Sequence, residues 1–174
     1  MPLAEALAAL PGFLGVKRRQ EVRGEVRGVT VLDDFAHHPT AVRETVSGLR
    51  ARYAGRRLVS VFEPRTNTSR RRVFQADYAR AFDGSDRVVV ARVADTPIYS
   101  ATGEVTERFS ADELVADLRA RGLDAVALDG PDAIVEDLAA TSRPGDVVLV
   151  MSNGAFGNVW EKLLARLAAP AARA

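Results

Sequence analysis

Apolar residues recur along this chain with two periods, which together predict alternating strands and helices. Nearly continuous apolar runs, typical of strands buried on both faces, occupy residues 29–32, 58–62, 87–91, 125–128 and 147–151. Apolar residues at helical spacing follow these runs over residues 42–53, 73–82, 114–118, 131–138 and 159–167. This alternation predicts an α/β fold, with a Rossmann-like, mostly parallel sheet and helices on both faces.

The two ends of the chain depart from this pattern. The first residues are rich in Ala and Leu, with leucines at helical spacing before a Pro-Gly break, which favours a short helix left from a preceding domain. Residues 22–32 alternate in polarity and predict two strands, with Gly24 and Gly28 at bend or bulge positions. The expected division is a linker remnant over 1–14, one domain over 15–168 and a frayed tail over 169–174.

Composition narrows the class of protein. The 174 residues, 47% hydrophobic and 27% charged, are typical of one soluble domain with its own core. A net charge of +1 predicts neither nucleic acid nor a membrane as partner, and the lack of cysteine excludes disulfides and thiolate chemistry. No apolar run approaches the ~20 residues needed to span a bilayer. The apolar start lacks the basic region of a secretory signal, so we expect a cytoplasmic protein.

The stretch Asp33–Thr40 (DDFAHHPT) contains both histidines of the chain. It connects a predicted strand to a predicted helix, and ligands of open α/β sheets collect at such turns. We expect Thr40 to be the N-cap of the helix, whose positive end suits phosphate or carboxylate groups.

Three interpretations of this stretch compete. In a purely structural one, Asp33 and Asp34 close the strand and the histidines cap the helix. A metal site is the second, but adjacent residues of a strand point to opposite faces, so the two carboxylates cannot readily hold one ion. The third is a nucleotide site, with one Asp accepting hydrogen bonds from ribose and a His near phosphate.

A second polar turn, Glu63–Ser69, also follows a predicted strand. Arg65 can make a bidentate contact with a carboxylate, while Asn67 and Thr68 offer neutral hydrogen bonds. The next three residues, Arg70–Arg72, predict a basic helix start. Simple solvation explains such a cluster, but cations at a helix N-terminus oppose the helix dipole, which favours an acidic ligand.

A third turn, Ser152–Gly157, joins the last strand to the last helix. Its small residues let the backbone approach a ligand, and free amides at a helix start can hold an anion. Glycines at such a turn serve steric relief equally well, so this pattern alone does not decide between the two roles.

The three turns together resemble motifs of the Mur ligases, the ATP-dependent enzymes that build and recycle peptidoglycan precursors. The matching stretches are Asp34–Thr40, Phe62–Ser69 and Met151–Gly157, and the resemblance extends from Gly15 to Leu167. It implies the third, carboxy-terminal domain of such a ligase. The Glu-Pro-Arg-Thr-Asn-Thr segment is most similar to ligases that join UDP-N-acetylmuramate to the tripeptide L-alanyl-γ-D-glutamyl-meso-diaminopimelate.

The resemblance also implies residue roles. Asp34 would contact the ATP ribose, with His37 or His38 near the nucleotide. Peptide contacts would come from Arg65, Asn67, Thr68, Ser152, Asn153, Gly154 and Phe156. The family holds its Mg²⁺ mainly through the central domain, so no metal ligand and no catalytic residue is expected here. Phe35 replaces the more frequent Tyr, and Ala155 and Asn158 stand where glycine is common.

Parts of a complete ligase are missing from this sequence. It contains no Gly-x-x-x-x-Gly-Lys-Ser/Thr phosphate loop, and neither the lysine of the central domain nor the domain for the UDP-sugar has a counterpart. Phosphoryl transfer depends on positioning and electrostatics, most of which the phosphate loop supplies. We therefore expect the chain to close over ATP and present the peptide amine without turning over alone.

Other functions fit the same residues. The same domain of a UDP-N-acetylmuramate–L-alanine ligase is the nearest alternative, although Arg65 and Arg70–Arg72 offer more carboxylate partners than a small amino acid needs. A non-catalytic nucleotide- or peptide-binding module is another, because fold alone does not determine function. A metal-dependent hydrolase built on the Asp/His turn is the third.

Overall fold

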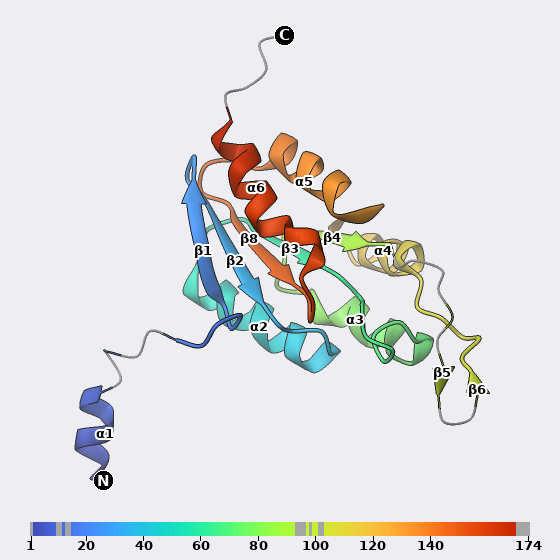
Figure 1. The fold of residues 1–174 in the computed structure, drawn as a ribbon, viewed down its shortest axis with the longest axis horizontal. Helices are drawn as coiled ribbons and strands as arrows, with labels where there is room; N and C mark the ends of the chain where they lie inside the picture. Colours follow the sequence, from blue (N-terminus) through green and yellow to red (C-terminus); the bar gives the residue numbers. More distant parts are fainter. Residues whose placement is uncertain are drawn as a thin grey trace.

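The computed structural model describes residues 2–9, 12, 15–92, 97, 99–100 and 103–169. A six-stranded sheet lies between two groups of helices (Figure 1), in the strand order β1-β2-β8-β3-β4-β7. The strands are β1 Glu21–Val26, β2 Val29–Asp34, β3 Leu58–Phe62, β4 Arg87–Ala91, β7 Asp124–Leu128 and β8 Val147–Met151. The helices that cover them are α2 Pro39–Arg52, α3 Gln75–Ala81, α4 Ala111–Ala120, α5 Gly130–Thr141 and α6 Val159–Ala168.

The sheet is parallel apart from its first strand, so the predicted fold class is confirmed. β2, β8, β3, β4 and β7 pair in parallel, whereas β1 pairs antiparallel with β2. A tight turn at Arg27 and Gly28, with φ of 53° and 75°, joins β1 to β2, as a hairpin of right-handed twist requires. The pairing register shifts between Val22 and Gly24, which confirms the bulge expected there.

The five parallel strands contribute to two cores on opposite faces of the sheet, whereas β1 adds only the partly buried Val26 to one of them. Leu58 and Phe62 of β3 belong to the core under α2, α3 and α4, whereas Val59 and Val61 belong to the core under α5 and α6. Successive strand residues point to opposite faces, so a strand covered on both sides is mostly apolar, and the buried Ser60 of β3 shares a hydrogen bond with Ser85 at 2.7 Å. All five residues of β3, β4 and β8 are buried, which explains why these strands were predictable from nearly continuous apolar runs.

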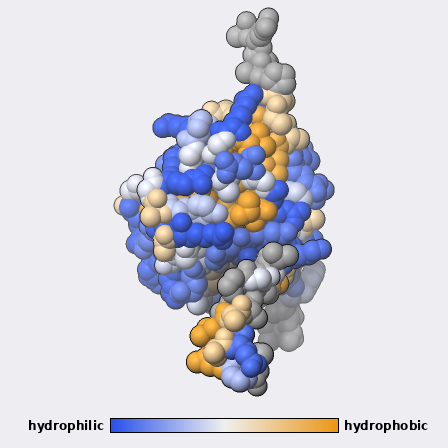
Figure 2. Space-filling view, turned by 90° about the vertical axis from the view of Figure 1, so that its left-hand side faces the viewer, coloured by the Kyte–Doolittle hydropathy of each residue, from blue (hydrophilic) through white to orange (hydrophobic). Residues whose placement is uncertain are grey.

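A short helix and a small two-stranded hairpin lie outside the six-stranded sheet and its covering helices. The expected amino-terminal helix is present as α1 Leu3–Ala9, which stands away from the body (Figure 1), and Leu3 is 74% exposed. Figure 2 shows apolar side chains gathered on this helix at the bottom of the view. Strands β5 Tyr99–Ser100 and β6 Gly103–Glu104 pair antiparallel.

Some expectations fall where the structure gives no description. Part of the expected 1–14 linker and all but the first residue of the 169–174 tail lie outside the described residues. Within the part of the chain that is described, no helix has the length and apolarity needed to cross a bilayer.

The structure corrects the predicted start of α2. Thr40 is not the N-cap: the helix begins at Pro39, and His38 caps it, accepting a hydrogen bond from the Thr40 amide through Nδ1 at 3.4 Å. Proline is favoured at the first helical position because it has no N–H to leave unpaired and its φ is already helical. β2 also continues two residues beyond the predicted end at Leu32 and includes Asp33 and Asp34.

The structure also corrects the region of the arginine cluster. The helix predicted over residues 73–82 is preceded by a 3₁₀ turn, η2 Arg72–Phe74, and α3 begins only at Gln75. Arg71 instead forms a β-bridge with Arg108. Arg71 is the N-cap and Arg72 the first residue of this 3₁₀ turn, whereas Arg70 lies before it, so only part of the cluster stands at a helix start.

Candidate functional site

The three polar turns meet at one edge of the sheet. Asp34 at the end of β2 and Phe62 at the end of β3 are both in register with Met151, the last residue of β8. Parallel strands present their carboxyl ends at the same edge, so the turns after β2, β3 and β8 lie side by side. This arrangement places the three motifs around one site.

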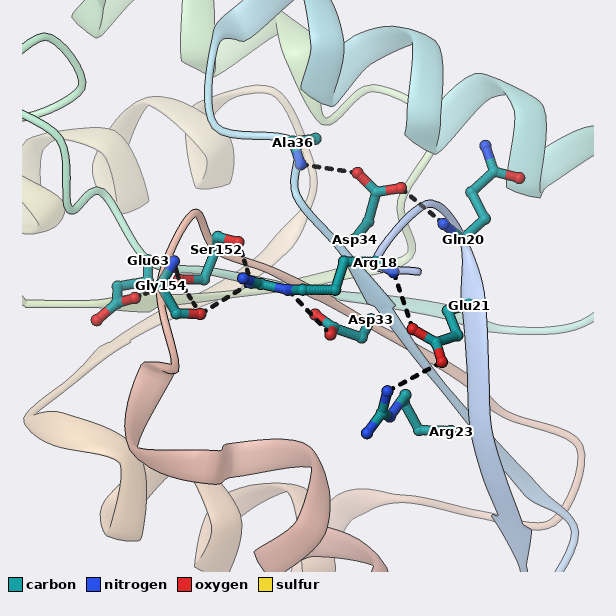
Figure 3. Close-up of polar contacts among 10 residues, drawn as sticks. All are labelled: Arg18, Gln20, Glu21, Arg23, Asp33, Asp34, Ala36, Glu63, Ser152 and Gly154. Atoms are coloured by element: carbon teal, nitrogen blue, oxygen red, sulfur yellow. Dashed lines mark hydrogen bonds and ion pairs between the residues drawn. The ribbon is translucent and has the colours of Figure 1, made fainter. Parts of the chain in front are cut away.

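Arg18, just before β1, holds the turn after β8 in place (Figure 3). Its Nη2 donates to the carbonyl oxygens of Ser152 at 2.6 Å and Gly154 at 2.8 Å, while its Nε donates to Asp33 Oδ2 at 3.2 Å. Arg18 itself has a φ of 56°, in the left-handed region. One guanidinium thus connects the segment before β1, strand β2 and the last turn.

Ser152 is also held from the side of β3. Its hydroxyl donates to a carboxylate oxygen of Glu63 and accepts from the Gly154 amide at 2.9 Å. The Glu63 amide in turn donates to the carbonyl of Met151 at 3.0 Å. Ser152 is buried, and its hydroxyl holds the turn together.

Arg65 lies directly over Gly154. A β-carbon at Gly154 would lie 1.5 Å from Arg65 Nη1, so the guanidinium occupies the space that any side chain there would fill. Among the described residues, Arg65 has no hydrogen-bonding or ion-pairing partner, and its side chain is exposed. Its guanidinium is therefore available for a carboxylate ligand.

The remaining peptide candidates occupy different environments. Asn67 and Thr68 are exposed at the tip of the turn after β3, in which the Ser69 amide donates to Thr66 Oγ1 at 2.9 Å. Asn153 Oδ1 is shut off from solvent and accepts no hydrogen bond within the described part of the chain. Phe156 is only 6% exposed and packs into the core under α5 and α6.

Asp34 forms the turn into α2. Its two carboxylate oxygens accept from the backbone amides of Ala36 at 2.7 Å and Gln20 at 2.8 Å (Figure 3). It is 3% exposed and borders a cavity of about 410 Å³ that Arg19, Phe35 and His37 also line. A carboxylate has further lone pairs, so these bonds leave room for another donor.

The two histidines separate. His37 lines the cavity beside Asp34, and its Nδ1 lies 2.9 Å from the carbonyl oxygen of Phe35. His38 points elsewhere, with its ring packed edge-on against Phe74 at a centroid distance of 4.8 Å. His37 is therefore the histidine that shares a cavity with Asp34.

Asp33 and Asp34 face opposite sides of the sheet, as the strand alternation predicts. Asp33 pairs with Arg18 and borders a second cavity, of about 270 Å³, away from the cavity of Asp34. Burial raises the pKa of Asp33 above its usual value, and the Arg18 guanidinium opposes that rise. Within the described residues, no three side chains of His, Cys, Asp or Glu gather closely enough to hold a metal ion.

Comparison with known proteins agrees with the three motifs. The family described as Mur ligase, glutamate ligase domain, matches residues 18–154, which is most of the chain. The chain belongs to the Mur ligase family. The resemblance to its carboxy-terminal domain is therefore confirmed.

Individual Mur ligases match almost the whole chain. Over 166 residues it is 39% identical to the UDP-N-acetylmuramate–L-alanyl-γ-D-glutamyl-meso-2,6-diaminoheptandioate ligase of Escherichia coli strain K12, covering 95% of this chain and 33% of that protein. It is 37% identical over 152 residues to the UDP-N-acetylmuramate–L-alanine ligase of Caldanaerobacter subterraneus subsp. tengcongensis, covering 87% and 32%. The crystal structure of a murein peptide ligase from Psychrobacter arcticus 273-4 has a TM-score of 0.75 and 30% identity, covering 97% and 33%.

The chain spans about a third of the length of these Mur ligases. Relatives with two different acceptor substrates match it at similar identity, so the comparison establishes a Mur ligase domain without selecting its substrate.

Sequence reasoning did not identify two residues that organise this Mur ligase site. Arg18 is far from its partners in sequence, and nothing in its local pattern signals a contact with Ser152 or Gly154. Glu63 was part of a motif, but its contact with Ser152 depends on β3 and β8 being neighbours in the sheet. Arg19, which lines the cavity of Asp34, was also not singled out.

Proposed function

We propose that the chain is the peptide-binding and ATP-closing domain of a ligase that joins UDP-N-acetylmuramate to L-alanyl-γ-D-glutamyl-meso-diaminopimelate. The observation that carries the proposal is the guanidinium of Arg65, which has no partner among the described residues and lies over Gly154 at the meeting point of the turns after β3 and β8. An arginine side chain in this position, beside a glycine turn, is suited to bind a carboxylate in a bidentate manner.

Charge favours the tripeptide over L-alanine as the acceptor. The tripeptide carries several carboxylates, whereas L-alanine carries one. Besides Arg65, the turn after β8 lies beside Lys17, Arg18 and Arg23, which line the adjoining cavity. Arg18 and Arg23 pair with Asp33 and Glu21, so Arg65 and Lys17 are the cations left for a ligand, and two such cations are better matched to a ligand with several negative groups.

The cavity beside Asp34 supports a nucleotide contact. Its residues combine an acceptor at Asp34, a ring nitrogen at His37 and a cation at Arg19, whose guanidinium carbon lies 5.1 Å from the centroid of the Phe35 ring. These groups suit ribose hydroxyls and phosphate oxygens, so the residues fit an ATP contact. We propose that His37, and not His38, faces the nucleotide.

Other domains of a longer protein would supply the rest of the reaction. The phosphate loop, the Mg²⁺ ligands and the UDP-sugar site would come from amino-terminal and central domains, with residues 1–14 as the connection and 15–168 as the domain itself. Bound ATP and Mg²⁺ would activate the muramate carboxylate as an acyl phosphate. This chain would position the peptide amine for attack, remain inactive alone and work in the cytoplasm.

Calorimetric titration of the 174-residue chain tests the proposal. We expect binding of L-alanyl-γ-D-glutamyl-meso-diaminopimelate, a roughly tenfold weaker Kd in Arg65→Ala, and no heat with L-alanine. Arg166→Ala is the matched control, because it removes an arginine whose partner, Glu136, lies outside the site.

Each other outcome has a clear meaning. Binding of L-alanine alone would assign the domain to an alanine-adding ligase. Equal tripeptide affinity in wild type and Arg65→Ala would remove Arg65 from the site. No binding of either ligand would refute the peptide-binding role of this chain.

A further inference from the structure

A second cavity adjoins the proposed peptide site on the side of β1. It has a volume of about 270 Å³ and lies between β1 and the turn that leads from β8 into α6. We call it the basic cavity, and its walls include Lys17, Arg18, Arg23, Ser152, Gly154 and Trp160. None of its cations belongs to the three motifs that led to the family.

Gly154 connects the basic cavity to the peptide site. Arg65 covers the position where its side chain would be, while its carbonyl oxygen accepts from Arg18 at 2.8 Å and its backbone borders the cavity. A ligand that contacts Arg65 therefore lies next to the basic cavity, with only Gly154 between them. At about 270 Å³, the cavity is slightly below the ~300–1,000 Å³ of pockets that hold a whole small molecule, which suits part of a larger ligand.

One of the three cations that line the basic cavity has no ion-pair partner among the described residues. Arg18 pairs with Asp33 at 3.2 Å, and Arg23 pairs with Glu21 at 3.0 Å (Figure 3). Lys17 is the remaining cation, and no carboxylate of the described residues forms an ion pair with it. The cavity thus has a net positive charge that one carboxylate would neutralise.

Arg23 and Trp160 form a fixed wall of the cavity. The guanidinium carbon of Arg23 lies 3.6 Å from the ring centroid of Trp160, a stacked cation–π contact. With Glu21 on one edge and the indole against its face, Arg23 has little rotamer freedom left to lose. A wall ordered before binding reduces the entropic cost of taking up a ligand.

We propose that the basic cavity is the subsite for the terminal, carboxylate-bearing residue of the peptide substrate, with Lys17 binding its carboxylate and Arg23 and Trp160 forming the wall. This assignment rests on the proposed function and extends it. It explains how a domain of this family distinguishes a peptide with a distal acidic residue from a single amino acid: only the longer ligand reaches past Gly154.

Trp160 is the only tryptophan of the chain, so its indole N–H resonance reports directly on this cavity. The 174-residue chain is titrated with L-alanyl-γ-D-glutamyl-meso-diaminopimelate and, separately, with the dipeptide L-alanyl-γ-D-glutamate. We expect the tripeptide to shift the indole resonance and the dipeptide to leave it in place. Lys17→Gln should weaken tripeptide binding about tenfold and leave dipeptide binding unchanged.

The chain offers a matched control, because Lys162 is its only other lysine. Lys162→Gln makes the same change of charge at a side chain that pairs with Asp132, away from the cavity, and should bind the tripeptide as the wild type does. Folding of each variant is checked by the dispersion of its amide spectrum.

The outcomes separate the subsite from the proposed function. Tripeptide binding that neither shifts the Trp160 resonance nor weakens in Lys17→Gln would overturn the subsite and leave the proposed function standing. Equal weakening in both lysine variants would show a general charge effect and would also overturn the subsite. Absence of any peptide binding to the wild-type chain would overturn both proposals.

Discussion

Replacing Arg18 tests how much the turn after β8 depends on one side chain. Arg18→Met keeps most of the aliphatic stem and removes the guanidinium. The change deletes hydrogen bonds to Asp33, Ser152 and Gly154, which measure 3.2, 2.6 and 2.8 Å. It also leaves the carboxylate of Asp33, whose side chain is 6% exposed, without its ion-pair partner.

The expected loss follows from burial. Removing one partner of a fully buried ion pair costs about 3–5 kcal/mol, because the other charge stays buried alone. The Arg18 side chain is 32% exposed, so water replaces part of the lost interaction. We therefore expect the free energy of unfolding to fall by about 2–3 kcal/mol at neutral pH. The control Arg166→Met breaks a pair whose side chains are 42% and 62% exposed, and should cost no more than about 1 kcal/mol.

The pH dependence provides a second check. Burial raises the pKa of Asp33 above 3.8, and Arg18 opposes that rise. A carboxyl group with a raised pKa contributes stability that is present below pH 3.8 and lost as the pH rises through the folded-state pKa. Without Arg18 the pKa of Asp33 rises further. The variant therefore loses more stability than the wild type as the pH is raised from about 4 to neutral. The difference between them should be largest at neutral pH and shrink as the pH is lowered towards about 4.

Urea unfolding followed by circular dichroism measures both effects, for wild type, Arg18→Met and the double variant Arg18→Met with Asp33→Asn. The double variant should recover part of the lost stability, because the unpaired charge is gone. A loss below about 1 kcal/mol at neutral pH, or a difference that does not change with pH, would refute this reasoning.

Two further predictions concern the site and its support. Gly154→Ala should weaken tripeptide binding severalfold in calorimetry, because its β-carbon would displace the Arg65 guanidinium. The Arg65 side chain is exposed, so the free energy of unfolding in urea should fall by less than about 1 kcal/mol. A larger fall would mean that the turn itself is disrupted. Tyr78→Phe should lower the free energy of unfolding by about 1 kcal/mol, since the buried hydroxyl donates to the His37 carbonyl at 2.5 Å; unchanged stability in urea would show that this bond contributes nothing.

Sequence alone was sufficient for the strands and for the order of the elements. A strand covered on both faces has few polar positions to interrupt it, so β3, β4 and β8 appear as nearly continuous apolar runs, with Ser60 in β3 and Arg87 at the start of β4 as the exceptions. The motifs after β2, β3 and β8 also pointed to one family, because the order of the polar turns is written along the chain. The ends of elements were less predictable: at α2 two residues on either side of Pro39, His38 and Thr40, could both serve as a cap, and the choice depends on local backbone geometry.

Tertiary structure alone decided which residues act together. Arg18 reaches Ser152 and Gly154 across 134 and 136 positions of sequence, and Glu63 reaches Ser152 across 89, only because the sheet places β2, β8 and β3 side by side. The same packing placed His37 and not His38 beside Asp34, and it created the basic cavity between β1 and the last turn. Periodicity records which face of an element is buried, because burial acts on each residue separately. Contacts between charged groups depend on relative positions in space, and no local pattern in the sequence records those positions.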